Sequence, residues 1–195
     1  MSRESILAAI KQNQPESEGL PDAKGFVPIC YDNPAQKFSE VLTGIGGKIV
    51  SIESTGEIID YLNMHFTEAD RFATVLDGIP GLEKLILPED ARALDGIEVA
   101  VIAAGFGVAE NGAVWVTEKE MHHRVLPFIC QHLAVILDPA TILSNMHEAY
   151  SKIGQDNYGF AAFIAGPSKT ADIEQSLVLG AHGPKTMTIF LLSEK

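Results

Sequence analysis

Short apolar runs alternate with amphipathic segments along most of the chain. Residues 99–104 are apolar throughout, as in the buried strands of parallel sheets. Residues 48–52 alternate apolar and polar positions, as in a strand with one solvent-facing side. Apolar runs of similar length predict five further strands, at residues 72–76, 114–117, 133–137, 160–165 and 187–192.

Helical spacing and helix-start signals occur before and between these strands. Residues 2–14 carry isoleucine and leucine at helical spacing, up to a proline that ends the segment. Asn33 and Pro34 are typical N-cap and first-turn residues, and they predict a helix that stops at the glycines of residues 44–47. Residues 54–57 have the spacing of a capping box before another helix. Two more helices are expected, at residues 88–94 and 140–153.

This alternation of strands and helices predicts the α/β class. The expected architecture is a layered, open and mostly parallel sheet with flanking helices. A chain of 195 residues with 46% hydrophobic content is long enough for one good core. We therefore expect an N-terminal helix and arm over residues 1–32 and a single α/β domain over residues 33–195.

The charge balance narrows the classes of partner. A net charge of -12 argues against nucleic acid and against an anionic membrane surface, because both attract basic faces. Residues 1–96 hold sixteen acids and eight bases, whereas residues 158–195 hold three of each. An anionic ligand is therefore compatible with the C-terminal segment. With neither an apolar stretch of membrane-spanning length nor a signal-like start, the cytoplasm is the expected location.

Cysteine and histidine usage does not predict a metal or cofactor. The chain has two cysteines, Cys30 and Cys130, far apart in sequence, so we expect neither a disulfide framework nor iron–sulfur ligands. His122, His123 and His132 lie near Cys130, but their spacing matches no standard zinc pattern. A satisfied, partly buried side chain is the expected role for Cys130 or His132.

Residues 105–112, Gly-Phe-Gly-Val-Ala-Glu-Asn-Gly, resemble the start of a dinucleotide fingerprint. The third glycine of that fingerprint would fall at Glu110, and no Walker A motif occurs elsewhere, so both nucleotide motifs fail. Asn111 and Gly112 between apolar runs predict a hairpin with a type I′ turn. A carboxylate beside such a turn is a candidate site residue.

A second motif closes the chain. The apolar strand of residues 160–165 stops at Gly-Pro and is followed by Ser168, Lys169 and Thr170, then by a polar stretch compatible with a helix. At a helix start, hydroxyls and free N–H groups bind anions. Asp172 would add an orienting carboxylate and His182 a titratable imidazole. The alternative is ordinary N-capping by one hydroxyl. We expect strand, loop and helix start to meet at one rim.

These motifs, in this order, resemble a known family. Residues 166–174 followed by residues 180–184 look like the closing signature of LUD-domain proteins, specifically lactate utilization protein C. Residues 105–112, Arg124 and the Leu-Pro pair of residues 126–127 fit the same pattern. The resemblance implies the fold shared by ribose-5-phosphate isomerase, glucosamine-6-phosphate deaminase and coenzyme A transferases. It also implies a role in L-lactate oxidation to pyruvate alongside iron–sulfur partner proteins, which would carry the clusters.

The resemblance suggests roles for individual residues. Arg124 suits a carboxylate or phosphate, although a surface ion pair with Glu118 or Glu120 is the alternative. With Ser168, Thr170, Asp172 and His182 it would form the binding rim of an accessory subunit that takes a small carboxylate or another anion, and an oligomer remains open. Glu110 resembles the glutamate nucleophile of class I coenzyme A transferases, whose neighbouring residues differ here. The alternative function is thus a stand-alone enzyme on a phosphosugar or acyl-coenzyme A, using Glu110.

Overall fold

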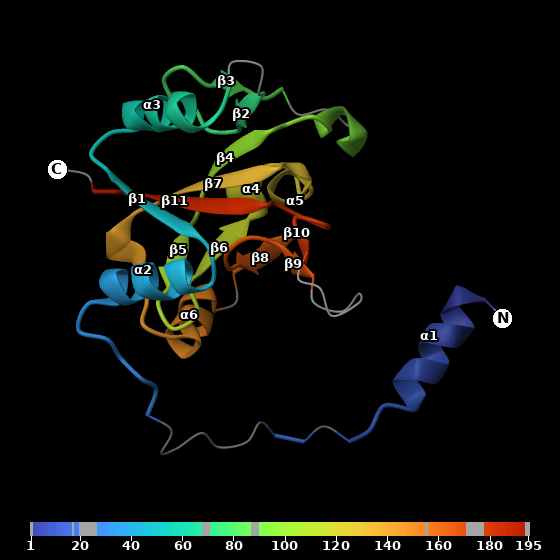
Figure 1. The fold of residues 1–195 in the computed structure, drawn as a ribbon. Coiled ribbons are helices and arrows are strands. Elements are labelled where there is room, and N and C mark those ends of the chain that lie inside the picture. The colour runs from blue at the N-terminus through green and yellow to red at the C-terminus, as the bar shows by residue number, and fades with distance from the viewer. Residues whose placement is uncertain are drawn as a thin grey trace.

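A six-stranded parallel sheet forms the centre of the protein (Figure 1). The computed structural model describes residues 2–16, 18, 19, 27–67, 71–86, 90–154, 156–170 and 178–193. Across the sheet the strands are β1 (Lys48–Ile52), β11 (Thr186–Leu192), β7 (His132–Leu137), β4 (Val99–Ala103), β2 (Phe72–Thr74) and β3 (Glu83–Lys84). The predicted α/β class and mostly parallel sheet are confirmed. The two-residue strand β3 was not predicted.

Helices cover both faces of this sheet. Alternate residues of a strand point to opposite faces, and in β4 Val101 packs with α3 (Gly56–His65) while Ile102 packs with α2 (Pro34–Gly44) on the other side. The short helices α4 (Glu118–Met121) and α5 (Leu126–Ile129) join α2 in the larger core through fully buried Met121 and Leu126. The central strands read as continuous apolar runs because both of their faces are buried.

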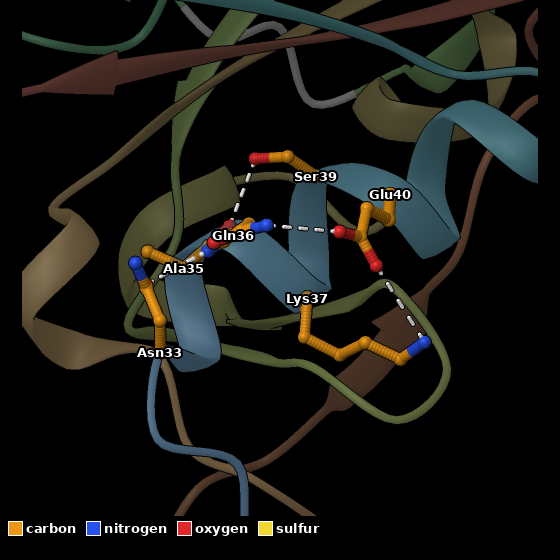
Figure 2. A network of polar contacts seen from close by, with 6 residues as sticks. All are labelled: Asn33, Ala35, Gln36, Lys37, Ser39 and Glu40. Carbon is orange, nitrogen blue, oxygen red and sulfur yellow. Dashed lines mark hydrogen bonds and ion pairs between the residues drawn. The ribbon is translucent and has the colours of Figure 1, made fainter.

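The N-terminus of α2 is held by local polar contacts, as its sequence predicts (Figure 2). The Asn33 side chain accepts a hydrogen bond from the backbone N–H of Gln36 at 3.0 Å. Gln36 donates from its amide to Glu40 at 3.1 Å, and Lys37 pairs with the same carboxylate at 3.7 Å. All these groups lie within one helix and its cap, so sequence alone defines this helix start.

A second, antiparallel sheet packs beside the first. It contains β5 (Phe106–Val108), β6 (Ala113–Thr117) and β8 (Ala161–Ile164) in the order β5-β6-β8. The predicted hairpin is present, but the type I′ turn is wrong: four residues, 109–112, join Val108 to Ala113, and of these only Gly112 has positive φ, 68°. Asn111 instead accepts a hydrogen bond from Ala113 N at 3.0 Å, which closes the longer loop.

Two helix predictions need correction. The segment predicted as one helix over residues 140–153 forms a 3-10 turn, Pro139–Thr141, and then α6 (Met146–Ile153), because the backbone of Leu143 bonds to β5 in between. Before α3, Glu57 accepts from the backbone N–H of Ser54 at 2.9 Å, but no N-cap side chain returns the bond, so the capping box is half formed. The short helix predicted at residues 88–94 is present over Ala91–Leu94, as a 3-10 helix.

Near the N-terminus, α1 (Arg3–Gln12) occupies most of the predicted residues 2–14. None of its residues is buried, and its apolar side chains Ile6, Leu7 and Ile10 are exposed. No helix among the described residues is long and apolar enough to cross a membrane.

Candidate functional site

The two halves of the closing motif come together in one hairpin. Strand β9 (Lys169–Thr170) pairs antiparallel with β10 (Val178–Leu179). Ser168 donates from its backbone N–H to the carbonyl of Pro184 at 2.9 Å and accepts from Gly180 N at 3.1 Å. Ser168 therefore lies against the Gly180–Pro184 segment, and the exposed His182 belongs to the same hairpin. We call residues 166–170 and 178–185 the closing hairpin.

The helix start expected after this motif lies outside the described residues. Lys169 and Thr170 are strand residues whose backbone pairs across the hairpin. The polar stretch that follows Thr170, with Asp172, lies outside the part of the chain that the structure describes. The anion site at a helix start stays a prediction.

The closing hairpin leads into the amino end of the central sheet. Lys185 N donates to the carbonyl of Gln131 at 2.7 Å, beside the first residues of β7 and β11. The ammonium of Lys169 donates to the carbonyl of Ile45 at the end of α2. Open α/β sheets usually bind ligands at the opposite edge, outside the carboxyl ends of the strands. The hairpin is nevertheless basic, with Lys169, His182 and Lys185 exposed and no acid in the described parts of residues 157–193.

Glu110 is bonded to the start of α6. Its Oε1 accepts a hydrogen bond from the backbone N–H of Met146 at 2.8 Å, and its own N–H donates to Ser144 at 3.1 Å. Asn145, 1% exposed, caps the same helix by accepting from Glu148 N at 3.0 Å. The Glu110 carboxylate thus serves one of the N–H groups at a helix N-terminus that have no partner within the helix.

Arg124 forms the surface ion pair that was the alternative expectation. Its Nε donates to the carboxylate of Glu118, and its guanidinium lies 5.6 Å from the ring centre of Phe160. Glu120 instead accepts from Thr117 N at 2.8 Å and completes the capping box of α4. The guanidinium of Arg124 therefore already has a carboxylate partner within the protein.

A sizeable hollow lies elsewhere on the described surface. A cleft of about 650 Å³ lies next to the carboxyl end of β4, between the base of the β5–β6 hairpin, α4, and the loop that follows α6. None of the predicted site residues lines it, although Arg124 reaches its wall through Glu118. Its lining residues are Gly105, Phe106, Trp115, Thr117, Glu118, Lys119, Glu120, Lys152, Ile153, Asp156, Asn157, Tyr158 and Gly159.

Sequence reasoning missed this cleft. Its walls come from residues 105–120 and 152–159, which the pairing of β6 with β8 and the packing of α6 against β5 bring together. Gly159 marks one such contact, because a Cβ there would lie 2.3 Å from a carboxylate oxygen of Glu118. Glycine at 159 leaves room for the Glu118–Arg124 pair in the wall.

The histidine and cysteine groups do not converge on a metal site. Among the described residues, no three histidine, cysteine, aspartate or glutamate side chains are placed to share an ion. Cys130 is 1% exposed, and burial raises the pKa of its thiol from 9.0 to about 12. His132 bonds to Thr186 Oγ1 at 2.7 Å and lies 3.3 Å from a Glu98 oxygen. Cys130 thus packs in the core at the end of α5, and His132 is the first residue of β7.

Comparison with known proteins points to relatives of one kind. Lactate utilization protein C of Bacillus pumilus is 28% identical over 113 residues, 55% of this chain and 47% of that protein. The uncharacterized protein YkgG of Escherichia coli is 30% identical over 128 residues, 63% of this chain and 52% of that protein. Lactate utilization protein C of a Geobacillus strain is 26% identical over 207 residues, covering 100% of this chain and 80% of that protein. The chain thus spans about half the length of the first two relatives.

Fold comparison and a family model agree with these relatives. A crystal structure of a DUF162 family protein from Deinococcus radiodurans superposes with a TM-score of 0.60 at 14% identity, over 85% of this chain and 100% of that one. At this identity the likeness concerns the fold alone. The model of the LUD domain matches residues 44–192, which include the central sheet, the β5–β6 hairpin and the closing hairpin. The chain therefore belongs to the LUD domain family.

Proposed function

We propose that this protein is a component of lactate utilization, acting as an accessory subunit rather than as the protein that carries the electrons. The observation that carries the proposal is the set of relatives named lactate utilization protein C, one of which aligns with the whole chain. The contact region that we assign to this role is the closing hairpin.

The chemistry of the closing hairpin supports an anionic partner. Lys169, His182 and Lys185 are exposed there on a chain whose net charge is -12. A basic surface on an acidic protein orients it toward a small carboxylate or an acidic protein face. Lactate and pyruvate are small carboxylates, so the hairpin suits the substrate, the product, or a partner that holds them.

The cysteine content supports separate electron carriers. Oxidation of lactate to pyruvate releases two electrons, and an iron–sulfur cluster is usually held by four thiolates. This chain has two cysteines, one exposed and one buried. We therefore assign the clusters to partner proteins and expect this subunit to bind those proteins.

The test is genetic and biochemical. Deleting the gene in the organism of origin should abolish growth on L-lactate while leaving growth on glucose unchanged. The purified chain should bind the iron–sulfur proteins encoded with it. A variant with His182→Ala and Lys185→Met should lose this binding and fail to restore growth. The control variant Lys48→Met, at an exposed lysine of β1, should keep the binding and restore growth.

Two results would contradict the proposal. Undiminished growth of the deletion strain on L-lactate would remove the role in lactate utilization. Full complementation by the His182 and Lys185 double variant would keep that role but remove the closing hairpin from it.

A further inference from the structure

Three aromatic side chains line the cleft beside β4. Trp115 and Phe106 stack with their ring centres 6.0 Å apart and their planes 20° from parallel. Tyr158 meets Trp115 edge-on at 5.4 Å and remains 40% exposed. Gly105 also lines the cleft, and a Cβ there would lie 3.6 Å from Trp115 Cδ1. Exposed aromatic surface gathered in one hollow is typical of sites that bind a ring.

Two lysines of the cleft are available to an anion. Glu118 is paired with Arg124, whereas Glu120 accepts only from Thr117 in the cap of α4 and keeps its negative charge. Neither Lys119 nor Lys152 forms an ion pair with a described residue. The two lysines therefore share the lining with two acids that have no cation partner among the described residues, Glu120 and Asp156, and it is the lysines that an anion would contact.

The ring surface and one of these lysines lie side by side. The ammonium of Lys152 lies 5.2 Å from the ring centre of Phe106, which lines the cleft together with Trp115. A ligand whose ring contacts Trp115 and Tyr158 therefore places a charged substituent near Lys152. A volume of about 650 Å³ is in the range of small-molecule and cofactor sites, and a three-carbon acid would leave most of it to water.

We propose that this cleft binds a planar heteroaromatic ring carrying an anionic group, a ligand of about mononucleotide size. Trp115 and Tyr158 contact the ring, and Lys119 and Lys152 hold the anion. This site is separate from the closing hairpin, and it takes a ligand of a different class from lactate.

The protein carries its own reporter for this site. Trp115 is its single tryptophan, so tryptophan fluorescence and the one indole N–H resonance both come from the cleft. We would titrate with AMP, flavin mononucleotide and nicotinate as rings that carry an anion. Adenosine supplies a ring without the anion, and ribose 5-phosphate and lactate supply anions without the ring. At least one ligand of the first group should change both signals saturably, and adenosine and ribose 5-phosphate should bind at least about tenfold more weakly than AMP if AMP is that ligand.

Matched variants separate the ring contact from the charge contact. Lys152→Met should weaken binding about tenfold and reduce its salt dependence, because a charge-assisted bond is lost. Lys11→Met changes another last-turn helix lysine, outside the cleft, and should bind as the parent does. Tyr158→Leu should weaken binding about tenfold through loss of ring contact. Circular dichroism checks that each variant is folded.

Three outcomes would overturn the proposal. One is that no ring-bearing anion changes the Trp115 signals. Another is that adenosine binds as tightly as AMP, which would remove the anion from recognition. The third is that Lys152→Met binds as tightly as Lys11→Met. None of these assays depends on lactate growth or on partner proteins, so the cleft and the proposed function can fail independently.

Discussion

Glu110 allows a direct test of whether a motif glutamate serves structure or chemistry. Its Oε1 accepts from Met146 N at 2.8 Å, at the first residue of the eight-residue helix α6. Replacing it with alanine leaves that N–H to water and removes a negative charge from the positive end of the helix. The hydrogen bond contributes about 1 kcal/mol and the charge about 0.5 kcal/mol. Glu110→Ala should therefore lower the free energy of unfolding by about 1.5 kcal/mol.

The glutamine variant separates the contribution of the hydrogen bond from that of the charge. Glu110→Gln keeps an oxygen acceptor for Met146 N and loses only the charge, so we expect a loss of about 0.5 kcal/mol. Urea denaturation followed by circular dichroism measures both values. The control is Glu40→Ala, because Glu40 is exposed and its polar contacts with described residues are to Gln36 and Lys37 of its own helix. This variant should change stability by about 0.5 kcal/mol or less.

The result that refutes this reasoning is a Glu110→Ala protein as stable as the parent. Equal losses for the alanine and glutamine variants would also contradict it, since the oxygen acceptor would then contribute nothing. The same variants bear on function: Glu110→Gln should still restore growth on L-lactate. Loss of growth with a stable fold would instead support the alternative of a carboxylate nucleophile.

Three further predictions concern Gly47 and the two cysteines. Gly47→Ala should destabilise the protein by about 1–3 kcal/mol, because a Cβ there would lie 2.6 Å from Leu42 side-chain carbons, whereas Gly44→Ala has open space and should be neutral or stabilising in thermal unfolding. Cys30 is exposed and Cys130 buried with its thiol pKa raised to about 12, so a thiol reagent should modify only Cys30 in the native protein at neutral pH. Because the unfolded thiol loses its proton near pH 9.0 and the native one does not, Cys130 should lower stability as pH rises above about 9.0, a loss that Cys130→Ala should lack.

Local features of this protein follow from its sequence because the interactions that create them join near neighbours. Asn33 caps α2 through a residue three positions on, and the apolar run at residues 99–104 predicts β4 to within one residue. The order of glycine-rich, Leu-Pro and closing motifs likewise places the chain in the LUD domain family without any coordinates.

The failed prediction of a long helix depended on a distant partner. Residues 140–153 are not one helix, because Leu143 bonds to β5 more than thirty residues earlier in the chain. The short strand β9, Lys169–Thr170, was not predicted, because its pairing partner is the backbone of residues 178–179. Local patterns do not specify these hydrogen bonds, which exist only once the tertiary structure has formed.

The chemistry of the surface shows the same division. The sequence offers both Glu118 and Glu120 as ion-pair partners of Arg124, and the fold decides that Glu118 is the partner. The cleft is a clearer case, since Trp115 and Tyr158 become neighbours only when β8 pairs with β6. Residue types and local elements are thus determined by the chain itself. Which side chains share a site is determined by long-range strand pairing, whose partners local sequence patterns do not specify.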